Sequence, residues 1–138
     1  MKDIDFLVDK YYTKMRYNCD RTMLLALGEL FEQKIDKQVI DSAVGQHVAG
    51  IRKQCGFVEG TLMFIGIYFA QMGKDDKQIG RICKDYMTSY IDEFEYPMCS
   101  DIRTKILKLK DDNLGQCADM AKRTIKHSYE FINKVSAR

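Results

Sequence analysis

The chain has 138 residues, of which 46% are hydrophobic and 30% are charged. This length suits one compact domain, so we expect residues 1–138 to form a single domain. The apolar fraction is too high for intrinsic disorder, and a net charge of +2 lacks the strong positive excess of a nucleic-acid-binding protein. The longest apolar run, residues 62–70, is less than half of the roughly 20 residues that cross a bilayer, so we expect no membrane insertion.

The N-terminus and the cysteine content both indicate a reducing environment. Residues 1–9 mix acidic and apolar side chains and lack the basic and then apolar regions of a secretory signal peptide. We therefore expect a cytoplasmic location. The five cysteines make up about 4% of the chain, well below the roughly 8 to 10% that is typical of small disulfide scaffolds.

Apolar residues at helical spacing predict helices in the first third of the chain. The first helix carries the apolar series Ile4, Val8, Tyr11 and Met15. Asn18 is a favourable N-cap because its side-chain oxygen can accept a hydrogen bond from a free amide, so we expect the second helix to begin at Cys19. A shorter helix over residues 39–44 then ends near Gly45.

Residues 56–71 are apolar on almost every side, which predicts a central helix covered by its neighbours. Gly56 and Gly60 lie one turn apart in this helix and lower its propensity by about 1 kcal/mol each, so we expect them to permit close backbone approach. The remaining periodicity predicts three more helices: one between Gly73 and Pro97, a short one over residues 102–109, and a last one over residues 118–135. The predicted fold is an all-α, single-domain bundle of about six to seven helices.

Four of the five cysteines share a position within the predicted helices. They lie at or within the first turn of a helix, whereas Cys83 lies well inside the fifth and is interpreted as core packing; the four are Cys19, Cys55, Cys99 and Cys117. Free amides and the helix dipole favour a thiolate at such a position, so we expect these thiols to have lowered pKa values. No C-x-x-C motif is present, so a shared site has to be assembled by the fold.

The order of these four cysteines, together with the segment Cys55-Gly56-Phe57-Val58-Glu59-Gly60, resembles the C_GCAxxG_C_C family over essentially the whole chain. The family is named for a suspected redox role. The resemblance implies that the four cysteines form the functional set, leaves Cys83 outside it, and supplies no substrate. Phe57 stands where the family has Ala, and we expect its bulk beside Cys55 to alter access to the site.

The leading functional hypothesis is a redox site in which the four thiolates hold an iron–sulfur cluster or a soft metal ion. A metal would offset the repulsion between the clustered thiolates. Three residues of the loop before Cys55 are accessory candidates, His47 as an additional ligand and Arg52 and Lys53 as positive charges. We interpret the other histidine, His127, as a surface residue.

Two alternatives stay open. One is metal-free thiol–disulfide exchange between pairs of the four cysteines. The other is a non-catalytic helical binding module, with an apolar pocket formed by tyrosine, phenylalanine and methionine side chains around the central helix. Whether the protein is an enzyme is left open, as is association with a second copy, and the electron partner is unidentified.

The basic residues near the C-terminal third do not predict a nucleic-acid patch. One stretch consists of Arg103, Lys105, Lys108 and Lys110. We interpret it as a solvated helix face, because charges at this spacing are usually directed to solvent.

Overall fold

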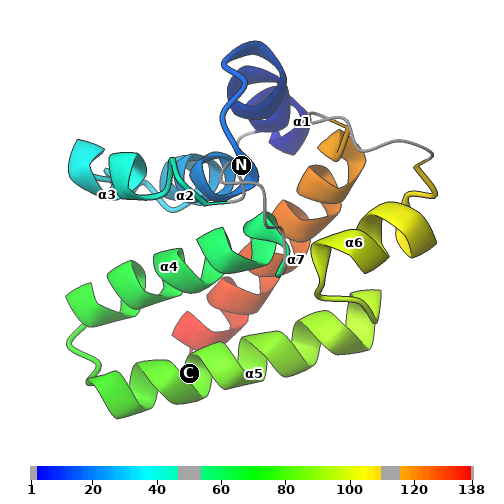
Figure 1. The fold of residues 1–138 in the computed structure, drawn as a ribbon. Helices are drawn as coiled ribbons and strands as arrows, with labels where there is room; N and C mark the ends of the chain where they lie inside the picture. The colour runs from blue at the N-terminus through cyan, green and yellow to red at the C-terminus, as the bar shows by residue number, and fades with distance from the viewer. Residues whose placement is uncertain (1–2, 47–53, 110–115, 138) are drawn as a thin grey trace.

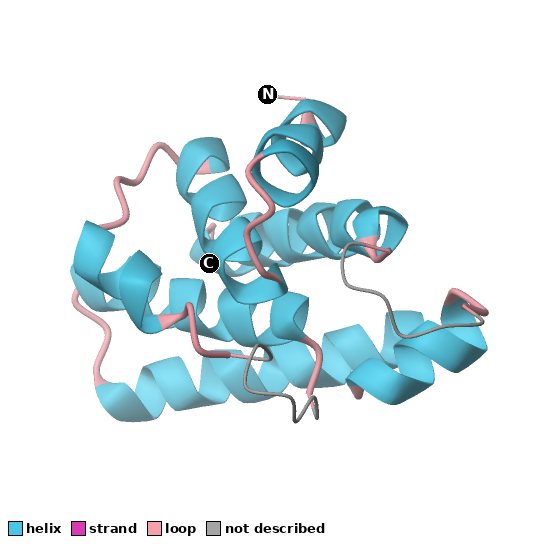
Figure 2. Cartoon of the chain, turned by 45° about the horizontal axis from the view of Figure 1, so that its top comes forward, coloured by secondary structure: helices cyan, strands magenta, loops and turns pink. Residues whose placement is uncertain are grey.

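A computed structural model describes residues 3–46, 54–109 and 116–137. Within these ranges the chain is helical, and the one sheet-like feature is an isolated antiparallel bridge between Gln54 and Met98 (Figures 1 and 2). The elements, in which η marks a π-helical segment, are α1 (Ile4–Val8), η1 (Asp9–Lys14), α2 (Cys19–Leu30), α3 (Lys37–Ser42), α4 (Gly56–Gln71), α5 (Asp76–Phe94), α6 (Cys99–Asp101), η2 (Ile102–Ile106) and α7 (Ala118–Ser136). The predicted all-α fold is confirmed.

The predicted start of α2 is confirmed by its capping geometry. Asn18 is the N-cap, and its side-chain oxygen accepts a hydrogen bond from the backbone N–H of Arg21 at 3.0 Å. The same side chain donates through Nδ2 to the carbonyl oxygen of Ala43 at 2.8 Å. Asn18 therefore both starts α2 and ties it to the segment that follows α3.

Two segments differ from the prediction. The first predicted helix is α-helical only to Val8 and continues as π-helical η1. The helix predicted over residues 102–109 begins earlier, at Cys99, and is π-helical from Ile102 to its end at Ile106. A π-helical turn bonds residues five apart and is wider than an α-helical turn. The spacing of apolar residues in the sequence does not distinguish α-helical from π-helical turns, because both bury a similar stripe of apolar side chains.

Helix α4 is central because it packs against α2, α5 and α7. Figure 1 shows α4 and α5 as neighbouring antiparallel helices, with α7 crossing them. Among the largest fully buried side chains are Phe57, Phe64 and Phe69 of α4 and Tyr86 and Tyr90 of α5. Within the described ranges, no helix is both long enough and apolar enough to cross a membrane.

Helices α2 and α4 approach each other closely at Gly56 and Gly60. A Cβ atom on Gly60 would lie 2.7 Å from the carbonyl oxygen of Asp20 and 2.8 Å from Cβ of Met23. A Cβ atom on Gly56 would lie 2.5 Å from Cβ of Cys19. These distances are too short for any side chain, which confirms the predicted role of the two glycines.

His127 is half-buried between α5 and α7, so its interpretation as a surface residue is wrong. Its Nε2 lies 2.8 Å from the Ser89 hydroxyl, and its ring packs against Tyr86, Tyr90 and Phe94. Burial lowers the pKa of this histidine. The long α5 reaches across this face of α7, a tertiary contact that the periodicity of α7 alone does not reveal.

The α2–α4 contact predicts different effects for two glycines of the same helix. Gly60→Ala should lower the free energy of unfolding by about 1–3 kcal/mol, because the added methyl group forces two backbones apart. Gly66→Ala is the matched control: nothing lies within 4 Å of a Cβ atom there, so it should stabilise the protein by about 0.5–1 kcal/mol through helix propensity. Urea denaturation measures both, and equal effects would contradict the close-contact interpretation.

Candidate functional site

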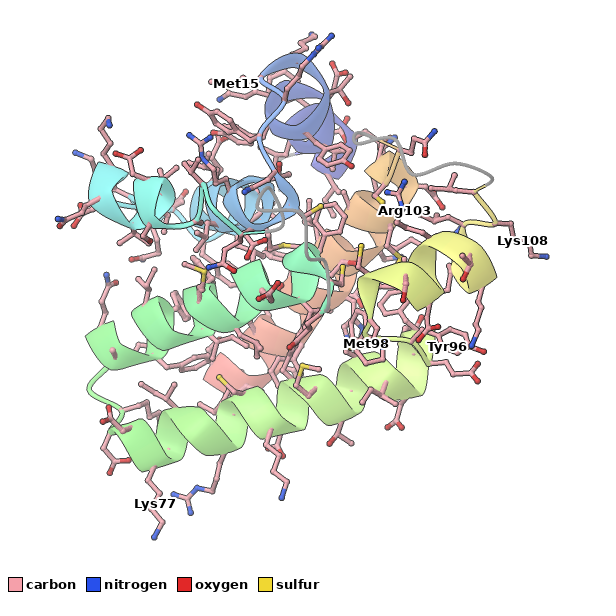
Figure 3. All side chains as sticks on the ribbon, in the orientation of Figure 1. Met15, Lys77, Tyr96, Met98, Arg103 and Lys108 are labelled. Atoms are coloured by element: carbon pink, nitrogen blue, oxygen red, sulfur yellow. The ribbon has the colours of Figure 1, made fainter. Side chains whose placement is uncertain are left out.

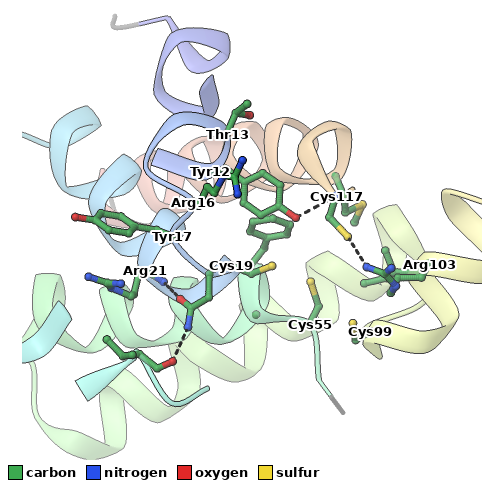
Figure 4. Close-up of a pocket in the computed structure, with 16 residues that line it drawn as sticks. Tyr12, Thr13, Arg16, Tyr17, Cys19, Arg21, Cys55, Cys99, Arg103 and Cys117 are labelled. Atoms are coloured by element: carbon green, nitrogen blue, oxygen red, sulfur yellow. Dashed lines mark hydrogen bonds between the residues drawn. The ribbon is translucent and has the colours of Figure 1, made fainter. Parts of the chain in front are cut away.

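Four of the five cysteines line one cavity of about 710 Å³. Two are the first residues of α2 and α6, and two are the N-caps of α4 and α7: in chain order they are Cys19, Cys55, Cys99 and Cys117. Their side chains point toward a common space in Figure 4. All are free thiols, and Cys83 lies within α5, away from this cavity.

Cys19 and Cys55 are brought together where α2 and α4 cross. Cys19 packs directly over the backbone of Gly56, where there is no room for a side chain. Cys55 precedes that glycine and is 5% exposed. The glycine of the Cys55-Gly56 pair is therefore needed for geometry, because it lets the start of α2 reach the start of α4.

A short backbone pairing brings Cys55 close to Cys99. The N–H of Cys55 donates to the carbonyl oxygen of Pro97 at 2.9 Å, beside the antiparallel bridge between Gln54 and Met98. Met98 is the N-cap of α6, and Cys99 is its first residue. The chain entering α4 and the chain entering α6 are thus fixed to each other immediately before their cysteines.

Cys117 is held by two side chains that come from the two π-helical segments. Its N–H donates to the hydroxyl oxygen of Tyr12, in η1, at 3.1 Å. Its sulfur accepts from Nη1 of Arg103, in η2, at 3.6 Å. The other end of that guanidinium, Nη2, donates to Oε1 of Gln116 at 3.2 Å.

Arg103 corrects the interpretation of its basic stretch as a solvated face. It is 8% exposed and lines the cavity, whereas Lys105 and Lys108 are exposed. Figure 3 shows Lys108 extending away from the helices. The reason is helical geometry: Arg103 lies four residues after Cys99 and so faces the same side of the chain. The fourth member of the stretch, Lys110, lies outside the described residues.

The expectation of lowered thiol pKa values is wrong for Cys19 and Cys55. Burial raises the pKa of Cys55 to about 12, although the amides of Val58 and Phe57 act in the opposite direction. Burial also raises the pKa of Cys19 well above its usual range, and the neighbouring thiols raise it further. Loss of hydration therefore outweighs the helix-end amides, and these thiols favour the protonated form when no other positive charge is near.

The donor set does not match a site for a single metal ion. Among the described residues, no group of three or more histidine, cysteine, aspartate or glutamate side chains is arranged to hold a metal ion. The accessory candidates His47, Arg52 and Lys53 lie outside the described residues. The cavity volume is instead within the range of about 300–1,000 Å³ that is typical of ligand pockets.

The described cavity wall also carries aromatic and cationic side chains, together with aliphatic and uncharged polar residues. The rings of Tyr12 and Phe57 lie 5.7 Å apart between centroids, and Phe57 is 1% exposed. Arg16, Arg21 and Arg103 also line the cavity, and no aspartate or glutamate is among its described lining residues. Tyr12 and Arg103 were not identified from the sequence as site residues, because neither belongs to a local motif.

The family described as putative redox-active protein (C_GCAxxG_C_C) matches residues 17–131. The chain belongs to this family. The matched region contains all four cavity cysteines and Arg103, while Tyr12 and Arg16 precede it. No curated protein and no solved structure gives a significant match.

The position of Phe57 in the wall predicts two separable effects of shortening it. Phe57→Ala should lower the free energy of unfolding by about 3–5 kcal/mol, because a fully buried ring is removed. It should also increase the rate at which iodoacetamide alkylates Cys55 in the reduced protein, because the cavity becomes larger beside this thiol. Urea denaturation measures the change in the free energy of unfolding, and peptide mapping after timed alkylation measures the rate at Cys55.

Phe64→Ala is the matched control, because Phe64 is equally buried in α4 but does not line the cavity. It should lower the free energy of unfolding by a similar amount without a specific increase in the alkylation rate of Cys55. Equal alkylation rates in the two variants would contradict a role for Phe57 in access.

Proposed function

We propose that this protein is a redox protein in which Cys19, Cys55, Cys99 and Cys117 together bind an iron–sulfur cluster. The observation that supports the proposal is the convergence of these four thiols, from four separate helix starts, on one cavity. Four cysteine thiolates are the common ligand set of such clusters. Membership of a redox-active family supports the general class of function.

A cluster agrees with the described residues better than a single soft ion does. No three histidine, cysteine, aspartate or glutamate side chains among the described residues are arranged to hold a single metal ion. A cavity of about 710 Å³ has room for a cluster of several atoms. A bound cluster would supply reversible electron transfer. Cys19 and Cys55, whose pKa values are raised by loss of hydration, would lose their protons on coordination, and the metal charge would offset that cost.

The remaining wall residues would exclude water and hold the ligands in place. Phe57 and Met120 are buried, and Tyr12 fixes the backbone of Cys117 through its hydroxyl oxygen. Arg103 supplies positive charge beside the same cysteine. We further propose that electrons are exchanged with a separate redox partner.

Thiol–disulfide exchange is the second candidate, and the exposure of two cysteines favours it. Cys19 and Cys99 are half-buried rather than buried, and exchange requires at least one sulfur that a partner can reach. In that case, two of the four thiols would form a disulfide, and the two electrons and two protons would reduce a disulfide of the partner to two thiols. Such a pair needs Cα atoms within about 7 Å.

Anaerobic reconstitution with iron and sulfide tests the proposal. We expect broad visible absorption, stoichiometric iron and acid-labile sulfide in the wild-type protein. Changing any one of the four cavity cysteines to Ser should lower the bound iron by at least about half, because four thiolates complete the ligand set. Cys83→Ser is the matched control and should bind as much iron as the wild type.

Two outcomes would contradict the cluster proposal. One is a protein that stays colourless after iron and sulfide are supplied. The other is a loss of iron in Cys83→Ser as large as in the four cavity variants. A colourless protein that forms one disulfide among the four cavity cysteines on mild oxidation would favour thiol–disulfide exchange instead.

A further inference from the structure

We propose that Arg103 is a positioning residue for Cys117. Its guanidinium holds the Cys117 sulfur toward the shared cavity and supplies a positive charge that raises the midpoint potential of the site. The part that concerns the potential rests on the redox function proposed above. The part that concerns Cys117 applies to the reduced, metal-free chain.

The contacts of Arg103 fix the direction of its guanidinium. Nη1 donates to Sγ of Cys117 at 3.6 Å, and Nη2 donates to Oε1 of Gln116 at 3.2 Å. Adjacent residues thus bind two nitrogens of one rigid planar group, which leaves it little freedom to rotate. Since Tyr12 accepts from the N–H of Cys117, this cysteine is held through both its backbone and its sulfur.

Burial makes the charge effective. Arg103 is 8% exposed and Cys117 is 7% exposed, so water screens their interaction only weakly. An arginine stays protonated under all ordinary conditions, so its charge is fixed.

A fixed positive charge favours whichever state of the site carries more negative charge. Reduction of a thiolate-ligated centre adds one electron, and reduction of a disulfide followed by loss of a proton leaves a thiolate. In both cases the reduced state is more negative, so removal of the guanidinium should lower the midpoint potential. For a disulfide, the same sign holds where Cys117 belongs to the pair and reduction leaves its thiolate beside Arg103.

The first test compares Arg103→Gln with Arg103→Lys in the reduced, metal-free protein. Timed alkylation with iodoacetamide, followed by peptide mapping, gives the rate at Cys117, with Cys83 as the internal reference. We expect the rate at Cys117 to be about tenfold lower in the Gln variant, because a hydrogen bond to a charged group is lost. The Lys variant retains the charge and should stay within about threefold of the wild type.

The second test measures the midpoint potential by anaerobic redox titration of the full chain. Arg103→Gln should have a lower potential than the wild type, and Arg103→Lys should recover most of the difference. Arg81→Gln is the matched control, because Arg81 is an exposed arginine of α5 that does not line the cavity. A wild-type potential in Arg103→Gln would overturn the inference, as would a Lys variant as impaired as the Gln variant.

A comparison within the wild-type chain covers the case in which Arg103→Gln does not fold. Cys83 lies within α5 and does not line the cavity that Arg103 and Cys117 share. If Arg103 acts as proposed, Cys117 is alkylated faster than Cys83 although it is the more buried of the two; slower alkylation would overturn the inference. Failure to bind a cluster would contradict the proposed function alone, because these thiol rates do not require one.

Discussion

The contact between α2 and α4 at Gly56 and Gly60 is the constraint on which the cysteine site depends. There is no space for a Cβ atom at either position, so the two helix backbones meet directly. This contact places Cys19 over the start of α4, beside Cys55. Because α4 also packs against α7, the helix that follows Cys117 is brought to the same part of the fold.

Two further attachments complete the arrangement. The backbone pairing at Pro97 connects the start of α4 to the start of α6, and Arg103 connects η2 to the sulfur of Cys117. Convergence has an electrostatic cost, because burial and the neighbouring thiols raise the pKa of Cys19. A site built in this way stabilises thiolates only when positive charge is supplied, which Arg103 provides on one side and a bound metal centre would provide throughout.

The helices and the positions of the cysteines could be predicted because they depend on local signals. Apolar periodicity and the Asn18 cap determine where α2 begins, and the glycine spacing indicates the close approach to α4. The pKa shifts could not be predicted, because they depend on burial of the helix ends in the tertiary structure. Arg103 was misassigned for a similar reason: its charge suggests solvent, and only the fold shows that it faces Cys117.

The most direct measurement of the central claim is crystallography of the anaerobically reconstituted protein with anomalous scattering recorded at the iron edge. The account predicts one iron peak, or one compact group of peaks, within the cavity bounded by the sulfurs of Cys19, Cys55, Cys99 and Cys117. Arg103 should lie beside Cys117, and Cys83 should have no iron near it. Iron bound elsewhere, or a cavity without iron in a protein that contains it, would contradict the account.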